Sequence, residues 1–547
     1  METSLRQRSS SALRERVAVI GLGSTGIAAL KNLREAGFDA VGFEKNPYIG
    51  GLWRYTADQQ TLSVTKSTRT NVSWQRFQFT DFPWPKDPGN YPTAAEVSRY
   101  IDQYAEHFQL LPHCRLGLGI HKLDRSKDAD LWDLTLKDKD GDLITEQFNR
   151  VLVTSGVQSH PVMPEIEGME HFKSKIIHSI AFKEPKDYAN QRVLLVGLSN
   201  TGGDIAAELS DVCPEIFVSH RSGLLIVNRT EEGKAPTDHR ATRRANRFVL
   251  ALNRHFPRFA SYLANTALEL AMKYRMKVQP EWKLLPAHPI TNVAPVMNDH
   301  LVSLLRSGRV KSLPGVTSFS PDGHTATFSD NTTLSNIDTV IFCTGFDFDH
   351  SFLGDSANPF LHPTPEWDNH PNSNNMPYAR LYRGLFSLDH PDSLAFIGVY
   401  RGHSISAFVN GDLASSAIAQ IWRGHHALPA RAEMDTWCDA NYRAMLAQIQ
   451  VWRTVQVGQS AKEFETFLNA AAGNGLNEKL HGWGWEAWRF MLGNWRLYRL
   501  LMDGIDTPFV YRLFESPRGE KGRKRWEGAE EAIWRTNGKS VPAKKYV

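Results

Sequence analysis

The first strong pattern in the chain is an apolar run, followed by a glycine-rich turn and an amphipathic segment. Residues 17–20 read VAVI, residues 21–26 read GLGSTG, and apolar positions then recur every three to four residues through IAALKNLREAG. This order predicts a buried parallel strand, a tight turn and a helix that stops at Gly37. A second strand is expected at Ala40–Phe43, with Glu44 at its end. The segment is typical of a βαβ nucleotide-binding unit.

The same pattern returns near residue 190. The run RVLLV at 192–196 leads into GLSNTG and the helical segment GDIAAELS. The next apolar run, Ile216–Ser219, predicts a strand that ends at His220 and Arg221. Two strand–turn–helix units of this kind in one chain favour an α/β protein with two nucleotide folds.

The remaining patterns suggest how the two folds are connected. We expect a helix at Thr93–Phe108, a strand at Arg150–Thr154, a basic helix-like stretch at Asp238–Tyr274 and a strand at Thr339–Phe342. This order indicates two Rossmann-like domains, the second inserted into the first, followed by a helical C-terminal region. The expected boundaries are 14–165 for the first part of the outer domain, 166–334 for the inserted domain, and 335–547 for the second part and the C-terminal region.

The first glycine-rich turn has the composition that a dinucleotide requires. Such a turn needs one glycine for the bend, one where the pyrophosphate approaches the backbone, and one where helix and strand pack closely. Gly21, Gly23 and Gly26 occupy these places, and Glu44 follows at the distance expected for an acid that binds the ribose hydroxyls. Ser24 and Thr25 complete the expected FAD-binding turn. The alternative is a glycine-rich turn without a ligand.

The second turn differs from the first in two places. Gly197 and Gly202 are present, but Ser199 stands at the middle position, and the following strand ends in Arg221 and Ser222 where an acid would be expected. A guanidinium at that place matches the 2′-phosphate of NADPH, although a solvated surface arginine is the alternative. Two sites of different preference imply electron transfer from NADPH to FAD. The further cofactor-binding candidates in this unit are Asn200, Thr201 and Asp204.

Composition excludes several other classes of protein. A net charge of +4 over 547 residues argues against a nucleic-acid binder. The four cysteines are far apart and form no CxxC pair, which disfavours a zinc ribbon or a dithiol reductase and fits a reducing compartment. The sequence has no HExxH motif, histidine–carboxylate cluster or nucleophile elbow, so we expect no catalytic metal and no Ser or Cys triad.

The chain also lacks an apolar run long enough to span a membrane. No stretch of 18 apolar residues occurs, and arginines interrupt the aromatic C-terminal region. We therefore expect a cytoplasmic protein. A basic stripe with helical spacing is expected to be a solvated face, with peripheral contact to an anionic membrane as the alternative. Its members are Arg240, Arg243, Arg244 and Arg247.

Several segments resemble the flavin-containing monooxygenases of the dimethylaniline monooxygenase type. EKNPYIGGLW at 44–53 is similar to that family's ribose-binding acid and flavin segment, and TNVSWQRFQFTDFP at 70–83 to the segment that carries its active-site asparagine. Phe172, His178 and Phe182 match the fingerprint FxGxxxHxxx(Y/F), with Ser174 in place of its glycine. VSHRSG, CTGF, TPFVYRL and RWEGAEEAI are also family-like, but the hydrophobic tail of microsomal members is missing.

This resemblance implies the roles of further residues. Gly51, Leu52 and Trp53 would contact the flavin, and Thr70, Asn71 and Val72 would lie where the two cofactors meet. Asn71 would be the catalytic polar group, since its amide offers both a donor and an acceptor; a turn-capping asparagine is the alternative. His178 would lie in the linker between the nucleotide domains, where a structural role is favoured.

The family reaction implied is oxygenation of a soft nucleophilic nitrogen or sulfur atom. NADPH would reduce FAD, the reduced flavin would capture O₂ as a hydroperoxide, and a small-molecule substrate would attack the distal oxygen. One alternative is a Baeyer–Villiger monooxygenase acting on a ketone, but that group usually has an acid at the place of Asn71 and Trp-Pro at the place of Phe182-Lys183. Others are an NADPH–FAD reductase without oxygen insertion and a nucleotide-binding module without turnover. The sequence does not indicate the oligomeric state, and the expected substrate-pocket residues lie within 225–290 and around Tyr400–Phe408.

Overall fold

A computed structural model describes residues 15–127, 130–230, 234–290, 293–373, 376–400, 406–451, 460–481, 484–520 and 522–542. Its larger sheet joins strands from both ends of the chain, as expected for an interrupted outer domain. The strands at Arg16–Ile20, Asp39–Glu44 and Arg150–Val153 confirm the predicted ones. In spatial order the seven strands are β20 (Leu381–Tyr382), β21 (Phe386–Ser387), β22 (Leu394–Phe396), β7 (Arg150–Val153), β1 (Arg16–Ile20), β2 (Asp39–Glu44) and β3 (Cys114–Leu116).

Helices cover one face of this sheet. Helix α1 (Ser24–Glu35) follows the first glycine turn, and α8 (Ala407–Trp422) packs along it. The contact is close because Gly411 has no side chain: a methyl group there would lie 2.8 Å from Oγ1 of Thr25. Helix α2 (Ala94–His107) confirms the prediction at 93–108 and begins with a capping box between Thr93 and Glu96.

An antiparallel sheet of β4 (Gly119–Arg125), β5 (Trp132–Lys137) and β6 (Leu143–Phe148) covers the other face. Its inward side chains alternate along β5, where Trp132, Leu134 and Leu136 are fully buried. They share a core with apolar residues of β1 and β7. The first nucleotide fold is thus a three-layer structure around the large sheet.

The second sheet is entirely parallel and comes from the middle of the chain. Its order is β14 (Val310–Leu313), β11 (Glu215–Ser219), β10 (Arg192–Val196), β18 (Thr339–Phe342) and β9 (Lys175–His178). Strand β10 leads into α3 (Asn200–Leu209), and α6 (Leu301–Arg306) packs against α3. The two nucleotide folds and the insertion of one into the other are therefore confirmed.

The expected boundary at residue 334 is wrong. Strand β18 pairs with both β10 and β9, so the inserted fold continues to Phe342. The chain returns to the first fold only through β19 (Phe346–Asp347), which pairs antiparallel with β8 (His160–Pro161), the segment on which it left. The apolar run TVIF at 339–342 predicts a buried strand, but the run does not indicate whether that strand joins the sheet of the first fold or of the inserted fold.

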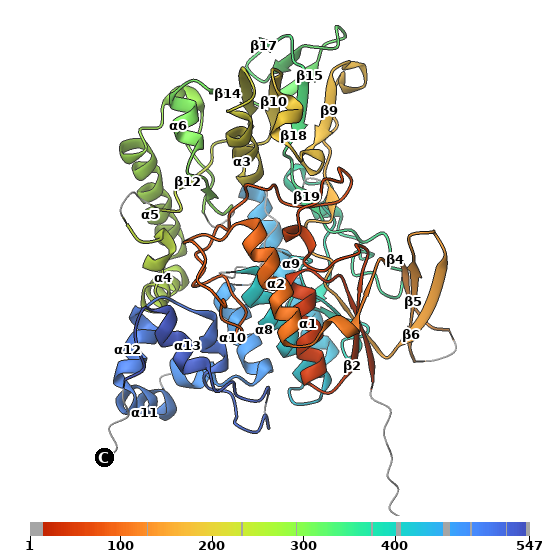
Figure 1. Ribbon diagram of the computed structural model, residues 1–547, viewed down its shortest axis with the longest axis vertical. Coiled ribbons are helices and arrows are strands. Elements are labelled where there is room, and N and C mark those ends of the chain that lie inside the picture. The colour runs from red at the N-terminus through yellow and green to blue at the C-terminus, as the bar shows by residue number, and fades with distance from the viewer. Residues whose placement is uncertain are drawn as a thin grey trace, which may run out of the picture.

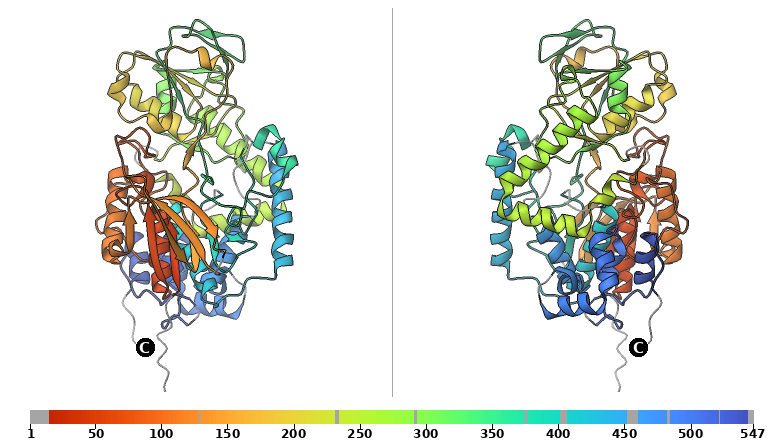
Figure 2. Two further views of the ribbon diagram at one scale, coloured as in Figure 1. Left: turned by 90° about the vertical axis from the view of Figure 1, so that its right-hand side faces the viewer. Right: turned by 90° about the vertical axis from the view of Figure 1, so that its left-hand side faces the viewer.

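Figures 1 and 2 show the second fold above the first, with helices from later segments along one edge. The helix-like stretch expected at 238–274 is divided into α4 (Arg243–His255) and α5 (Pro257–Leu270). The break falls at Pro257, which lacks an N–H group and restricts the residue before it. The C-terminal region is helical, as expected, with α9 (Arg431–Val451), α10 (Ala461–Ala472), α11 (Trp485–Gly493), α12 (Trp495–Asp503) and α13 (Ala529–Thr536).

The basic stripe at 240–247 is not the solvated face that the spacing suggested. Arg243 is buried and donates to Asp506 Oδ1 over 2.7 Å, while Arg244 pairs with Asp503. These two arginines attach α4 to α12 and to the segment that follows it. Their acidic partners are too distant in the sequence for helical spacing to reveal them.

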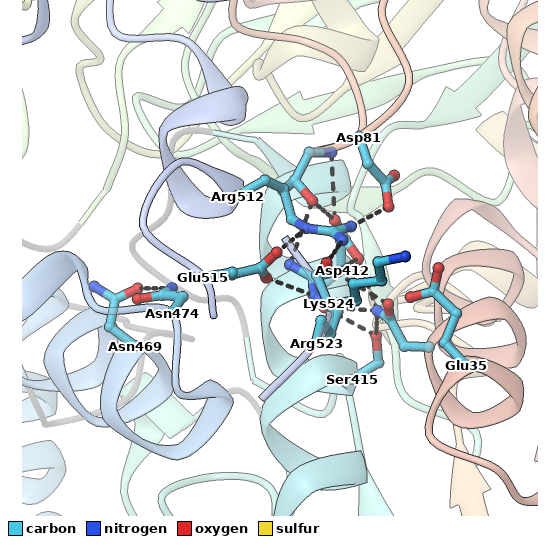
Figure 3. Close-up of polar contacts among 12 residues, drawn as sticks. Glu35, Asp81, Asp412, Ser415, Asn469, Asn474, Arg512, Glu515, Arg523 and Lys524 are labelled. Atoms are coloured by element: carbon cyan, nitrogen blue, oxygen red, sulfur yellow. Dashed lines mark hydrogen bonds and ion pairs between the residues drawn. The ribbon is translucent and has the colours of Figure 1, made fainter. Parts of the chain in front are cut away.

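A buried ionic network attaches the C-terminal segment to the first fold (Figure 3). Arg523 donates to Asp412 Oδ1 and to Glu515 Oε1, each over 3.0 Å, and Arg512 pairs with Glu515 and with Asp81. Lys31 of α1 also pairs with Asp81. The six side chains carry three charges of each sign, so the network is neutral.

Candidate active site

The first glycine turn fits a bound dinucleotide. Gly21 has a φ of +89°, and a methyl group on Gly26 would lie 1.8 Å from the carbonyl oxygen of Gly21. These two positions therefore exclude side chains. A methyl group on Gly23, in contrast, would meet nothing among the described residues closer than the Cα of Gly51 at 3.8 Å. The space beside Gly23 is the cradle that a pyrophosphate needs.

The helix that begins in this turn keeps its N–H groups available. Helices α2, α4, α8 and α10 are each capped by a serine or threonine side chain. Helix α1 begins at Gly23 and Ser24 with no side-chain cap among the described residues. Uncapped N–H groups at the positive end of a helix dipole suit a phosphate anion. Thr25 packs under Gly411, as described above, and so orients the start of the helix.

Glu44 stabilises the same turn from the end of β2. Its buried carboxylate accepts hydrogen bonds from the Leu22 N–H at 2.9 Å and from the Asn46 N–H at 3.0 Å. The acid is therefore held beside the glycine turn, where the sequence predicted it. Its expected contact with ribose hydroxyls stays a prediction.

The flavin segment predicted from resemblance lies against this turn. Residues Gly51–Trp53 form a 3-10 turn, and Gly51 faces Gly23 so closely that a methyl group on Gly51 would lie 3.0 Å from the Gly23 Cα. Leu52 accepts a backbone hydrogen bond from Val64, and Trp53 packs edge-on against Phe77 at 5.5 Å. The structure thus brings the two predicted FAD segments together.

The second glycine turn repeats the geometry of the first. Gly197 has a φ of +105°, and a methyl group on Gly202 would lie 2.3 Å from the Gly197 carbonyl oxygen. Ser199 stands before the first residue of α3, but neither its side chain nor another in the described segments caps the helix. The serine therefore leaves the N–H groups of α3 available. Asn200 accepts a hydrogen bond from the Met297 N–H at 2.9 Å, and Thr201 is exposed.

Arg221 lies at the strand end where the sequence predicted a ligand of the 2′-phosphate, and that contact stays a prediction. It follows β11, its side chain is exposed, and its Cγ lies over Gly315, where a methyl group would approach to 2.9 Å. No acidic side chain within the described ranges pairs with it, so the guanidinium is available to an anion. Ser222 beside it is engaged with His288, Oγ to Nε2 at 3.0 Å.

Asn71 lies where the two folds meet, and an arginine of the second fold holds it. Arg229 donates from Nη2 to the Asn71 Oδ1 at 2.8 Å and from Nε to the carbonyl oxygen of Thr70 at 3.0 Å. Arg229 is buried and also donates to Asp299 at 3.1 Å. Val72 accepts from the hydroxyl of Thr70 at 2.7 Å, which fixes the local turn. Sequence reasoning missed Arg229 and Asp299, because no motif or spacing marks either residue.

An unusual carboxylate lies beside this group. Asp204 in α3 accepts a hydrogen bond from Asn298 Nδ2 at 3.2 Å. Burial raises the pKa of Asp204 from its usual 3.8 to about 6, while the charge of Arg229 acts in the opposite direction. Asp204 is thus a cofactor-binding candidate with a titration close to neutral pH.

His178 serves the linker between the folds. Its Nδ1 accepts from the Ile180 N–H at 3.2 Å, so its Nε2 donates to the Gly345 carbonyl oxygen at 3.0 Å. Burial lowers the pKa of this histidine. A neutral ring with both nitrogens bound to backbone is a structural group. The pocket residues expected at 400–408 lie in part outside the described residues, since 401–405 are not described.

Comparison with known proteins agrees with this geometry. The family model described as flavin-binding monooxygenase-like matches residues 14–544. Monooxygenase aurF of Gibberella zeae is 36% identical over 518 residues, which are 94% of this chain and 96% of that protein.

Three solved structures share the fold. S-allyl-L-cysteine S-oxygenase from Allium sativum has a TM-score of 0.60 at 21% identity, covering 84% of this chain and 89% of its own. Cyclohexanone monooxygenase with bound ε-caprolactone has 0.60 at 18%, covering 84% and 98%. OTEMO in complex with FAD and NADP has 0.62 at 17%, also covering 84% and 98%.

The match along nearly the whole chain decides the class of enzyme. The cradle beside Gly23 and the uncapped start of α1 fit FAD. The uncapped start of α3 and the exposed Arg221 fit NADPH. The chain therefore belongs to the flavin-binding monooxygenase-like family, and it is a flavin-containing monooxygenase that uses FAD and NADPH.

Proposed function

We propose that the enzyme oxygenates a soft nucleophilic nitrogen or sulfur atom of a small molecule. The observation that carries this proposal is the Asn71 amide, held at the boundary of the two folds by Arg229. Bound FAD, once reduced by NADPH, would activate O₂ for transfer of one oxygen atom to the substrate. The protein must orient the two cofactors, exclude water and provide a hydrogen bond where the oxygen is activated.

The contact with Arg229 fixes which end of the Asn71 amide faces the site. A guanidinium has only donors, so the amide must present Oδ1 to Arg229. Nδ2 then remains a donor for which no acceptor occurs among the described residues. Asn71 therefore offers a directed N–H group to an oxygen atom or to a cofactor amide carbonyl. Asp299 balances the charge of Arg229, so the arginine orients the amide without leaving an unpaired buried charge.

Oxygenation of a ketone is the second candidate, because cyclohexanone monooxygenase shares the fold. The neutral amide at 71 disfavours it, since Baeyer–Villiger enzymes usually have an acid there. Where those enzymes have Trp-Pro, this chain has Phe182-Lys183. Phe182 stacks on Tyr188, and Lys183 donates to the carbonyl oxygen of Thr61 at 2.8 Å. Both observations favour the nitrogen or sulfur reaction.

The test is oxygen uptake together with product mass across a panel of amines, thioethers and ketones. Wild-type enzyme is expected to form N-oxides or S-oxides, and ketone products only as a minor activity. Asn71→Ala should still oxidise NADPH, but should release hydrogen peroxide, with product per NADPH lowered about a hundredfold for a loss of ~3 kcal/mol.

Asn369→Ala, at an exposed asparagine remote from the cofactor turns, is the control and should leave coupling unchanged. Asn71→Asp keeps the shape but removes the donor, so it should also uncouple the reaction. Esters or lactones as the main products would contradict the proposal and would support oxygenation of a ketone. NADPH oxidation with no oxygenated product from any substrate would instead support a reductase.

A further inference from the structure

A cavity of about 70 Å³ lies between helices α8 and α10 and the 3-10 turn at Pro508–Arg512. The two helices pack side by side (Figure 1), and α8 is buried along most of its length. Like the other helices of the described residues, α8 is not both long and apolar enough to cross a membrane. The cavity walls include the apolar side chains of Val409, Leu413, Phe464 and Leu468. A single water molecule needs about 10–15 Å³ of such space, so a small organic group fits.

Arg76 lines this cavity, which we call the Arg76 cavity, as a buried cation. The residue is only 3% exposed. Its Nη1 donates to the carbonyl oxygen of Asp238 at 2.6 Å, whereas Nε and Nη2 have no acceptor and no acid forms an ion pair with it in the described part of the chain. A buried guanidinium normally has an anionic partner, because an unpaired buried charge is costly. Nε and Nη2 together form an edge that can bind a carboxylate through two parallel hydrogen bonds.

Two acids also line the Arg76 cavity, but both have partners of their own. Asp506 accepts from Arg243 Nη2 at 2.7 Å. Glu465 accepts from the hydroxyl of Tyr511 at 2.9 Å and lies 3.8 Å from Arg243 Nη1. The two acids therefore exceed their shared arginine by one negative charge. The cavity thus favours one anionic group at Arg76 and disfavours a second one near Glu465.

The segment that carries Arg76 also carries Asn71, and the inserted fold holds this segment at two places. Arg229 binds Asn71, as described above. Asp238 accepts from the Ser73 N–H at 2.8 Å, and its carbonyl oxygen accepts from Arg76. The position of the guanidinium is therefore fixed relative to the same fold that fixes the Asn71 amide.

The Arg76 cavity also adjoins the predicted flavin segment. Phe77, the neighbour of Arg76, packs against Trp53 with ring centroids 5.5 Å apart and against Phe408 at 4.5 Å. Phe408 precedes Val409, a wall residue of the cavity. One aromatic cluster thus separates the cavity from the segment that is expected to contact the flavin.

We propose that the Arg76 cavity binds a carboxylate group of the substrate, so that the enzyme prefers small amines or thioethers that carry one carboxylate. The apolar walls suit the carbon chain between the carboxylate and the nucleophilic atom. A substrate held in this way at Arg76 can extend toward the site at Asn71. The preference for oxygenated products rests on the function proposed above, whereas binding of the carboxylate does not.

Matched acids and amides test this proposal. The probes are methylthioacetate, methylthiopropanoate and methylthiobutanoate, each beside its primary amide, which has nearly the same size but no charge. Calorimetric titration of the FAD-loaded full chain should show at least one acid binding about ten- to a hundredfold more tightly than its amide, as expected for a charged two-point contact. Formation of the S-oxide should show the same preference in kcat/KM.

Arg76→Met removes the charge but keeps an unbranched side chain, and it should abolish the preference for acid over amide. Arg76→Lys should retain part of the preference as a point charge. The matched control is Arg99→Met, at an exposed arginine of α2 that does not line the cavity, and it should keep the wild-type preference. The comparison of acid and amide in the wild type tests the proposal without any variant.

The possible outcomes separate this inference from the proposed function. Equal binding of acids and amides by the wild type, or a preference that survives Arg76→Met, would overturn the inference. Loss of FAD from a folded Arg76→Met protein, while Arg99→Met retains it, would assign Arg76 to the cofactor and would equally overturn the inference. Tighter binding of the acids without an oxygenated product from any probe would support the carboxylate site and contradict the proposed function.

Discussion

Arg229 donates a hydrogen bond to the side-chain oxygen of Asn71 over 2.8 Å, and this contact joins the two nucleotide folds. Arg229 comes from the inserted fold and Asn71 from the outer one. If Asn71 acts as proposed, we infer that Arg229 is a positioning residue that acts on the reaction through Asn71.

Removal of Arg229 should uncouple NADPH oxidation from oxygenation. A charged hydrogen bond to an amide contributes about 1.5–3 kcal/mol, so Arg229→Ala should lower product per NADPH roughly ten- to a hundredfold. The double variant with Asn71→Ala should be hardly worse than either single variant, because both remove the same interaction. Peroxide, NADPH and product measured together provide the readout. Strictly additive losses would mean that the two residues act independently.

The coenzyme preference should depend on Arg221. If its exposed guanidinium binds the 2′-phosphate, Arg221→Ala should lower kcat/KM for NADPH about ten- to a hundredfold, the equivalent of 1.5–3 kcal/mol. Turnover with NADH should barely change, and Arg221→Lys should retain part of the preference as a point charge. Steady-state kinetics with both coenzymes measure the effect. Equal losses with NADPH and NADH would make Arg221 a structural residue.

The glycine turns could be predicted from the sequence because their requirements are local. Gly21, Gly26, Gly197 and Gly202 are the residues that a tight turn and a close helix approach require, and the structure has them in those roles. The partner of Asn71 could not be predicted, because hydrophobic periodicity does not indicate which distant residues meet. The boundary at 334 failed for a related reason, since strand pairing determines which sheet receives β18.

Asp204 should make stability depend on pH. In the unfolded chain this carboxyl loses its proton near pH 3.8, whereas burial delays the loss in the folded protein to about pH 6. The folded state therefore holds an additional proton between these values, and its contribution to the free energy of unfolding falls as pH rises through that window.

Asp204→Asn cannot ionise and keeps an oxygen toward Asn298. The variant should exceed wild type in stability by roughly 1–3 kcal/mol at pH 7.5, and by little near pH 4. Urea unfolding at the two values measures this difference. Asp211→Asn, which makes the same change at an exposed acid just after the same helix, is the matched control. A constant difference at both pH values would contradict the raised pKa.

The buried network around Arg523 should be far more sensitive to substitution than surface ion pairs. Asp412 is fully buried and accepts from Arg523 at 3.0 Å and from Asn32 at 2.7 Å, so Asp412→Asn leaves the buried network with one unbalanced positive charge. Removing one partner of a buried pair costs about 3–5 kcal/mol, because the other charge stays desolvated. Arg244→Ala, which breaks the exposed pair with Asp503, should cost less than about 1 kcal/mol. Urea unfolding of the two variants beside wild type measures the contrast. Equal losses would mean that water reaches the network and screens its charges, and that the C-terminal segment is held by its apolar contacts alone.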